Sequence, residues 1–242
     1  MAKFINDIKS DFITCFLTKN RWRFITDGLG ATLTITFFAC ILGILIGVIV
    51  AIVRSTHDKN YKEMRNGIGK SLLAVLNAIA KLYLTVIRGT PMLVQLMIMY
   101  YIIFAKASNG IVCAITAFGI NSGAYVAEIF RSGIMSVDNG QFEAGRSLGF
   151  SYIRTMQYIV VPQAFKSVLP ALANEFIVLL KETSVAGYVA IQDLTKGGDI
   201  IRSATYKTYM PLLTVAAIYL VMVIFFTHLV GKLERRLRNS ER

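Results

Sequence analysis

Long uncharged stretches alternate with short polar, basic segments along this chain. The clearest stretch, residues 29–53, holds no charged side chain. An α-helix rises 1.5 Å per residue, so it would reach about 37 Å, more than the roughly 30 Å hydrocarbon core of a bilayer. Uncharged stretches at 110–127 and 212–230, and an apolar stretch with three charges at 168–191, predict further spans. The pattern indicates an all-α protein that crosses a membrane several times.

The stretch between the first two clear spans is broken. Residues 71–87 are apolar apart from Lys81, and the sequence Arg-Gly-Thr-Pro follows at 88–91. Thr90 can cap a helix, and a proline suits the first helical turn because no N–H is needed there. We therefore expect residues 91–105 to form the remaining span, five in total, with 71–87 as an interfacial helix leading into it.

The two ends of the chain differ from the spans. Residues 4–17 repeat apolar groups at helical spacing and place charges on the other faces. This predicts a short amphipathic helix in the membrane interface, although a helix packed on the rest of the protein fits the same pattern. The organisation predicted is an N-terminal interfacial segment (1–27), a transmembrane domain (28–231) and a basic tail (232–242).

Basic residues are distributed unequally between the two sides that five spans would create. The 54–70 loop, segment 131–166 and the tail hold 14 Lys and Arg, against 4 in the turn at 106 and the 192–209 loop. Positive residues are enriched on the cytoplasmic side, so the three richer segments and the C-terminus are predicted to be cytoplasmic. The N-terminal segment, with five Lys and Arg on the outer side, runs against this trend.

Composition supports a membrane protein and argues against other classes. Hydrophobic residues make up 55% of the chain and charged residues 17%, whereas soluble domains carry about 25% charged residues. The net charge of +12 comes from basic residues beside apolar spans, which favours anionic lipid headgroups over nucleic acid. The cysteines and histidines lack metal-ligand spacing, so no metal site is predicted.

The segment between the third and fourth spans carries the most specific pattern. Its marked residues, at fixed spacing, are Glu143, Ala144, Gly145, Gly149, Ile159 and Pro162. Residues 143–148 favour a helix, and Gly149 can adopt the left-handed conformation that ends one. The spacing predicts a short, rigid helix between two turns.

These residues resemble the EAA loop of binding-protein-dependent ABC importer permeases, written EAA-x3-G-x9-I-x-LP. In the loop at 143–162, Gly145 replaces the second alanine and Val161 replaces the leucine. Four further stretches resemble the polar amino-acid branch of that family. They are residues 30–34, residues 88–91 with Gln95, Asn174-Glu175, and residues 180–184. The resemblance covers about residues 28–230.

The resemblance implies a transport function that is powered by ATP hydrolysis on another polypeptide. An ABC ATPase subunit that carries ATP and Mg would dock on the coupling residues Glu143, Ala144, Gly145, Gly149 and Pro162. A second permease chain, identical or related, and an extracytoplasmic substrate-binding protein would complete a bacterial cytoplasmic-membrane importer. This chain would carry no cofactor. Independently, it contains no GxxxxGK[ST] phosphate-binding loop, so we expect no ATP hydrolysis and no enzyme activity.

Charged residues inside a span are candidates for substrate contacts, because each costs about 2.5–3.5 kcal/mol at the bilayer centre. Glu175 and Glu182 share one face of a predicted helix, and Lys181 lies on the neighbouring stripe. An acid and a base there could bind the ammonium and carboxylate of an amino acid. Alternatively, Lys181 or Glu182 lies near the outer interface and snorkels.

Three uncharged polar residues could line the same cavity: Gln95, Asn121 and Tyr125. For each, an interhelical hydrogen bond is the alternative. A stand-alone, ion-coupled secondary transporter remains the rival function; inverted repeats would be expected for it, and none is visible. A membrane enzyme is disfavoured because the chain holds no paired histidines, HExxH, GxSxG or carboxylate cluster.

Overall fold

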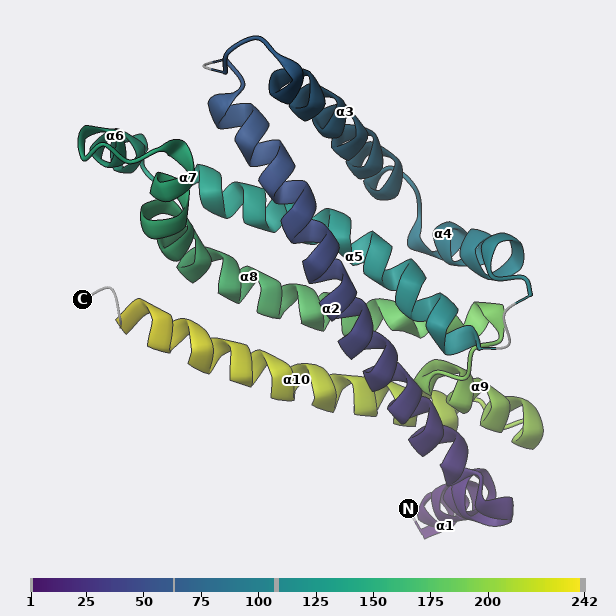
Figure 1. Cartoon of the computed structure of the whole chain (residues 1–242). Coiled ribbons are helices and arrows are strands. Elements are labelled where there is room, and N and C mark those ends of the chain that lie inside the picture. Colours follow the sequence, from purple (N-terminus) through teal and green to yellow (C-terminus); the bar gives the residue numbers. More distant parts are fainter. Residues whose placement is uncertain (1, 63, 107–108, 240–242) are drawn as a thin grey trace. The chain divides into compact units, whose positions relative to one another are not determined.

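The computed structural model describes residues 2–62, 64–106 and 109–239. Within these residues it is helical and contains no strand, which confirms the all-α prediction (Figure 1). The α-helices are α1 (Ala2–Phe12), α2 (Trp22–Asn60), α3 (Ile68–Arg88), α4 (Met92–Ile98), α5 (Gly110–Met135), α6 (Asn139–Ser147), α7 (Tyr152–Thr155), α8 (Val161–Glu182), α9 (Leu194–Thr205) and α10 (Tyr209–Asn239). Single π-helical turns lie at Ile13–Leu17, Met99–Ile103 and Met156–Val160, and 3-10 turns at Thr18–Asn20 and Thr183–Val189.

The chain forms two compact units that each collect three separate segments. The first unit comprises Met1–Ala39, Met92–Phe118 and Ile177–Leu229. The second unit comprises Cys40–Pro91, Gly119–Phe176 and Val230–Arg242. The three segments predicted to be cytoplasmic, 54–70, 131–166 and 232–242, belong to the second unit.

Five helical segments among the described residues are long and apolar enough to cross a membrane, in agreement with the predicted number. They are α2, α3, α5, the continuous stretch Tyr152–Val189 that contains α8, and Tyr209–Leu237 within α10. The identity of the second span differs from the prediction. It is α3, with 21 residues, whereas the apolar helix Met92–Ile103 is shorter.

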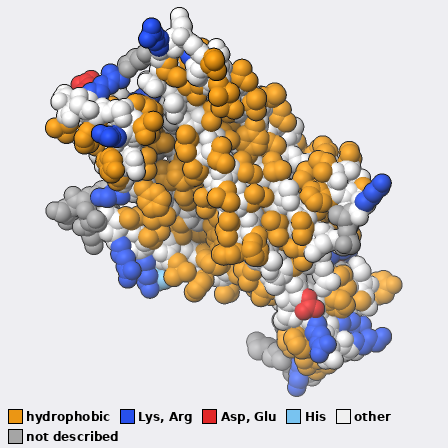
Figure 2. All heavy atoms as spheres, in the orientation of Figure 1, with side chains coloured by type: hydrophobic (Ala, Val, Ile, Leu, Met, Phe, Trp, Pro, Cys, Tyr) orange, Lys and Arg blue, Asp and Glu red, His pale blue; other side chains and the backbone are white. Residues whose placement is uncertain are grey.

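The single charge of Lys81 is the reason why α3 was predicted to be an interfacial helix and not a span. Its side chain is exposed on a helix that is otherwise apolar on that surface. Large hydrophobic side chains are exposed along α3: Leu72, Val75, Leu76, Ile79, Leu82 and Val86. Figure 2 shows this hydrophobic surface over α3. Thr90 Oγ1 donates to the carbonyl of Val86 at 2.8 Å, so its hydroxyl also helps to end α3.

Helices extend beyond the apolar stretches that revealed them. α2 has 39 residues and includes the polar residues 54–60, so the connection to α3 is only 61–67 and not the predicted 54–70 loop. α10 likewise continues through the basic residues 232–239. A change in composition shows where a helix enters polar surroundings, but it does not end the helix. Neither glycine nor proline interrupts the helix at residues 54–60 or 232–239. Glu63, residues 107–108 of the predicted turn and residues 240–242 of the predicted tail lie outside the described residues.

The predicted polar loop before the last span contains α9, which is a correction. The glycine pair Gly197-Gly198 lies inside this helix and packs closely on neighbouring elements. A Cβ on Gly197 would overlap the carbonyl oxygen of Phe24, and one on Gly198 would lie 2.5 Å from a methyl of Val215. Asp193 caps α9 and accepts hydrogen bonds from backbone N–H groups, including that of Lys196 at 2.8 Å.

The N-terminal segment packs on other parts of the first unit. α1 ends at Phe12, and the predicted helix 4–17 continues from there as a π-helical turn. Asp11 forms an ion pair with Lys207 at 3.0 Å, and the Cys15 side chain is fully buried. Phe12 is exposed. Contact with the rest of the protein, the alternative interpretation of this segment, is therefore observed.

A stripe of small residues, Gly43 and Gly47 four positions apart, packs α2 against α5 in the second unit. A Cβ on Gly47 would lie 2.5 Å from a methyl of Val126, and one on Gly43 would lie 3.1 Å from the Cβ of Ser122. Only glycine permits this closeness of approach. The stripe is therefore a packing surface.

Candidate functional site: the α6 segment and the polar faces of α5 and α8

α6 is a short helix with a defined start and end. Asp138 caps it by accepting a hydrogen bond from the N–H of Gly140 at 2.6 Å. Gly149 follows the helix with a φ of +77°, and its N–H donates to the carbonyl of Arg146 at 2.8 Å. The predicted helix and its left-handed glycine are confirmed.

The two sides of α6 differ in their surroundings. Glu143 and Ala144 are exposed, and Leu148 directly after the helix is 71% exposed. Gly145 is buried, and a Cβ there would lie 2.6 Å from Oγ1 of Thr155 in the adjacent α7 (Figure 1). This contact explains the glycine where the EAA pattern has alanine, because α7 leaves no room for a methyl group.

Side chains from neighbouring helices hold α6 in place. Lys59 Nζ, near the end of α2, donates to Asn139 Oδ1 at 2.7 Å and lies 4.6 Å from the ring centroid of Phe142. Gln163 Nε2, in the first turn of α8, donates to Gln141 Oε1 at 3.0 Å. Sequence reasoning missed these anchors, since no local pattern marks a lysine 80 positions before its partner.

Pro162, also predicted for this segment, is exposed as the second residue of α8. The π-helical turn Met156–Val160 directly precedes it, so Pro162 lies inside the continuous helical stretch Tyr152–Val189 and not at its start.

A chain of charges links α2, α3 and α5 within the second unit. Arg131 contacts Asp58 at 3.4 Å and Glu128 at 3.3 Å. Arg88 lies 3.8 Å from Glu128, and its guanidinium is 5.6 Å from the ring centroid of Tyr125. Tyr125, a predicted substrate contact, is thus the aromatic partner of a cation in this structure.

Three of the six predicted substrate residues lie in the second unit. Glu175 of α8 accepts a hydrogen bond from Ser122 Oγ of α5 at 3.0 Å. Asn121 is 3% exposed beside that serine, and Tyr125 lies one turn further along α5. Ser122 was missed because a serine in an apolar span usually bonds only its own helix. The structure joins α5 and α8 here through a carboxylate.

The other three predicted residues lie in the first unit. Gln95 is half-buried on α4. Lys181 is exposed at the end of α8, and Glu182, its last residue, is half-buried. Gln95 is the only polar residue of α4, whereas α8 also holds Lys166 and Glu175.

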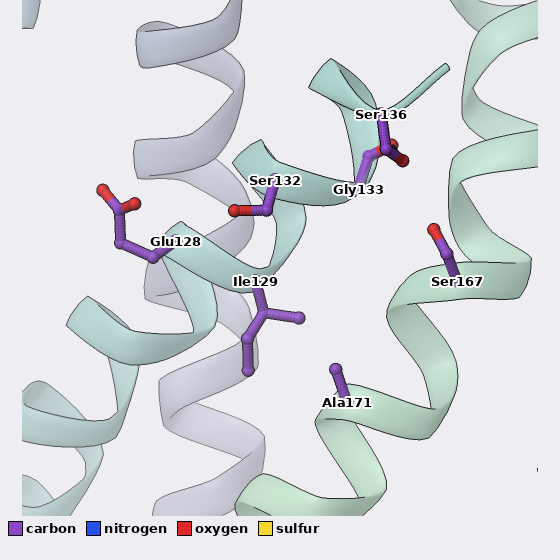
Figure 3. A pocket seen from close by; sticks show the side chains of 7 residues that line it. All are labelled: Glu128, Ile129, Ser132, Gly133, Ser136, Ser167 and Ala171. Carbon is purple, nitrogen blue, oxygen red and sulfur yellow. Dashed lines mark hydrogen bonds between the residues drawn. The ribbon is translucent and has the colours of Figure 1, made fainter. Parts of the chain in front are cut away.

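An open cavity of about 410 Å³ lies between α5 and α8 in the second unit. Its lining residues are Glu128, Ile129, Ser132, Gly133, Ser136, Ser167 and Ala171. Figure 3 shows Ser167 and Ala171 projecting from α8 toward α5. Glu128 and Ser132 continue the polar stripe of Asn121 and Tyr125 along α5.

Comparison with known proteins decides the family. Residues 68–239 match the family described as binding-protein-dependent transport system inner membrane component. The chain belongs to this family. It is 35% identical over 218 residues to the putative glutamine transport system permease protein GlnP of Rickettsia typhi, covering 88% of this chain and 93% of that protein. It is 33% identical over 221 residues to the arginine transport system permease protein ArtQ of Bacillus subtilis, covering 90% and 94%.

Two solved structures are similar in fold to this chain. The crystal structure of an amino acid ABC transporter with histidines has 40% sequence identity and a TM-score of 0.78, with coverage of 91% of this chain and 98% of that one. The methionine ABC transporter MetNI, at 19% identity and a TM-score of 0.74, shares the fold. The chain is therefore a multi-pass ABC importer permease of the amino-acid branch, a subunit type that is not itself catalytic.

Proposed function

We propose that this permease carries a polar amino acid across the cytoplasmic membrane by alternating access, driven by a separate ATPase subunit that docks on α6. The observation that carries the proposal is the construction of α6. It is short, capped by Asp138 and ended by Gly149, and it exposes Glu143, Ala144 and Leu148. A rigid, exposed helix that is attached to several spans can transmit a movement of the ATPase subunit to these spans.

The contacts of α6 support this mechanical role. Lys59 links it to α2, Gly145 packs on α7, and Gln141 links it to α8. A displacement of α6 would therefore reach α2 and the start of α8 together. The exposed Glu143 carboxylate can accept hydrogen bonds from the ATPase subunit, which would hold the ATP and Mg.

The substrate proposal rests on polar groups inside apolar helices. We assign contacts to Asn121, Tyr125 and Glu175 of the second unit, and further contacts to Gln95, Lys181 and Glu182. A carboxylate at Glu175 suits an ammonium or other donor group. The glutamine and arginine named for related permeases support a polar amino acid.

The orientation proposal follows from the basic segments 54–70, 131–166 and 232–242, which belong to the second unit. Positive residues favour the cytoplasmic side, so α6 and the C-terminus would face the cytoplasm. An extracytoplasmic substrate-binding protein would then deliver the amino acid from the other side. A second permease chain, identical or related, would complete the transmembrane path.

Reconstitution tests the function directly. The chain is placed in proteoliposomes with its ATPase subunits and binding protein, and uptake of radiolabelled L-arginine and L-glutamine is measured. Uptake should require ATP and disappear with a hydrolysis-deficient ATPase subunit. Uptake driven by an ion gradient without ATPase subunits would instead establish the rival function, a stand-alone secondary transporter.

A further inference from the structure

Two adjacent residues near the end of α2 contact different elements of the second unit. Asp58 lies 3.4 Å from Arg131 of α5. Lys59 Nζ donates to Asn139 Oδ1 of α6 at 2.7 Å and lies 4.6 Å from the ring centroid of Phe142. Because Asp58 and Lys59 belong to one turn of one helix, a movement of α6 that displaces Lys59 also displaces Asp58. A single carboxylate therefore connects the α6 anchor to α5.

Arg131 is shared between two carboxylates and is strongly bonded to neither. Its two terminal nitrogens lie 3.4 Å from Asp58 and 3.3 Å from Glu128, whereas a strong charge-assisted hydrogen bond measures about 2.7–2.9 Å. Its Nε is buried and has no hydrogen-bond partner among the described residues. A buried donor without a partner is unfavourable, so this arrangement does not fully satisfy the guanidinium. A small shift of α2 against α5 would shorten one contact and lengthen the other.

Each of the two carboxylates has a second arginine nearby. Glu128 lies 3.8 Å from Arg88, the last residue of α3. Asp58 lies 4.0 Å from Arg54, which precedes it by one turn in α2. Each carboxylate therefore keeps one arginine when Arg131 moves toward the other, and neither is left as an unpaired charge.

A purely structural role does not account for this network. The side chains in the Arg131 and Arg88 ion pairs are between 26% and 45% exposed, and ion pairs this open to solvent contribute little to stability. For the same reason, the difference in free energy between the two possible partners of Arg131 is small. The geometry suits a contact that changes during the transport cycle better than one that only holds the fold.

We infer that Arg131 is a positioning residue that exchanges its carboxylate partner between Asp58 and Glu128 as the ATPase subunits close and open. The exchange transmits a movement of α6 to α5 and, through the contact between Glu128 and Arg88, to α3. The inference rests on the proposed ATP-driven transport and deepens it by naming the contact through which α6 acts on these two spans.

The amount of amino acid taken up per ATP hydrolysed tests the inference. The permease is placed in proteoliposomes with its ATPase subunits and binding protein, and uptake of radiolabelled L-arginine and L-glutamine is measured together with phosphate release. Arg131→Gln removes the shared charge and should lower uptake per ATP about fivefold, the lower end of the usual range of coupling effects. Asp58→Asn removes one partner at nearly constant side-chain size and should act similarly, so it tests the contact even where Arg131→Gln fails to assemble.

A double variant separates positioning from a general loss of stability. If Arg131 acts through Asp58, adding Asp58→Asn to Arg131→Gln should cause no further fall in uptake per ATP, because the contact is already absent. Arg131→Lys keeps a positive charge and should recover part of the uptake per ATP. Asp11→Asn is the matched control. It also removes a carboxylate from an exposed ion pair, with Lys207 at 3.0 Å in the first unit, and should leave uptake per ATP unchanged.

Two outcomes would overturn the inference. One is unchanged uptake per ATP in both Arg131→Gln and Asp58→Asn, which includes the case in which uptake and ATP hydrolysis fall by the same factor. The other is a double variant in which the two single losses multiply. Failure of the transport proposal is recognised separately, as absence of ATP-dependent uptake by the unmodified complex.

Discussion

Replacing Gly149 by alanine tests how much the left-handed backbone at this residue contributes to coupling between the ATPase subunit and transport. The residue has a φ of +77°, and a Cβ built there meets no atom within 4 Å. The methyl group therefore causes no collision with neighbouring residues. The cost is the local strain of a left-handed L-residue, about 1–2 kcal/mol.

That strain acts on the bonds that end α6. Gly149 N–H donates to Arg146 at 2.8 Å, and Phe150 N–H donates to Gly145 at 3.0 Å. Because 1–2 kcal/mol changes an equilibrium by roughly 5–30-fold, a substantial share of variant molecules would lose this turn if it is only marginally stable. The orientation of α6 would then be distributed over several states, and ATP-driven uptake should fall several-fold.

The assay is the initial rate of ATP-dependent uptake in proteoliposomes, together with co-purification of the ATPase subunit. Gly149→Asn is the informative partner, because asparagine tolerates the left-handed region better than alanine and should retain more uptake. Gly30→Ala is the control, since a Cβ there also meets nothing and the residue lies inside α2. Equal uptake by Gly149→Ala, Gly149→Asn and the unmodified chain would refute the reasoning.

Three further predictions address the substrate contacts, the packing and the pH dependence. Glu175→Ala or Lys181→Ala should abolish uptake while the ATPase subunit still co-purifies, and normal uptake in both would remove these contacts from the path. Gly47→Leu should destabilise the protein by about 1–3 kcal/mol through overpacking, visible as a lower melting temperature, because even a Cβ lies 2.5 Å from a valine methyl of α5; no shift would contradict the tight α2–α5 contact. The hydrogen bond from Arg202 lowers the pKa of Asp199. Its stabilising contribution is thus present above the ordinary carboxyl pKa and lost as the pH falls through the lowered value, so Asp199→Asn should flatten the acid side of a stability profile; an identical profile would show that this ion pair contributes nothing.

The sequence was most informative where one local rule decides the structure. The α6 helix and the left-handed Gly149 follow from helix-forming residues and a glycine. The number of spans follows from apolar length. These features need no knowledge of distant residues.

Other features depended on contacts that a local pattern does not contain. Lys81 lowered the apparent hydrophobicity of α3, although a single exposed lysine leaves the apolar surface of that helix intact. The predicted 192–209 loop contains Gly197 and Gly198, and glycine weakens a helix, but here both glycines lie in α9 because they pack closely on Phe24 and Val215. Similarly, the bond between Ser122 and Glu175 joins residues 53 positions apart.

The central claim is that α6 contacts a separate ATPase on the cytoplasmic side. It is tested most directly by placing one cysteine at the exposed Ala144, after replacement of the three native cysteines, which are free, and cross-linking the assembled complex. The account predicts a cross-link between Ala144→Cys and the ATPase subunit, and labelling by a membrane-impermeant maleimide only from the cytoplasmic face. Labelling from the outer face, with no cross-link to the ATPase subunit, would contradict it.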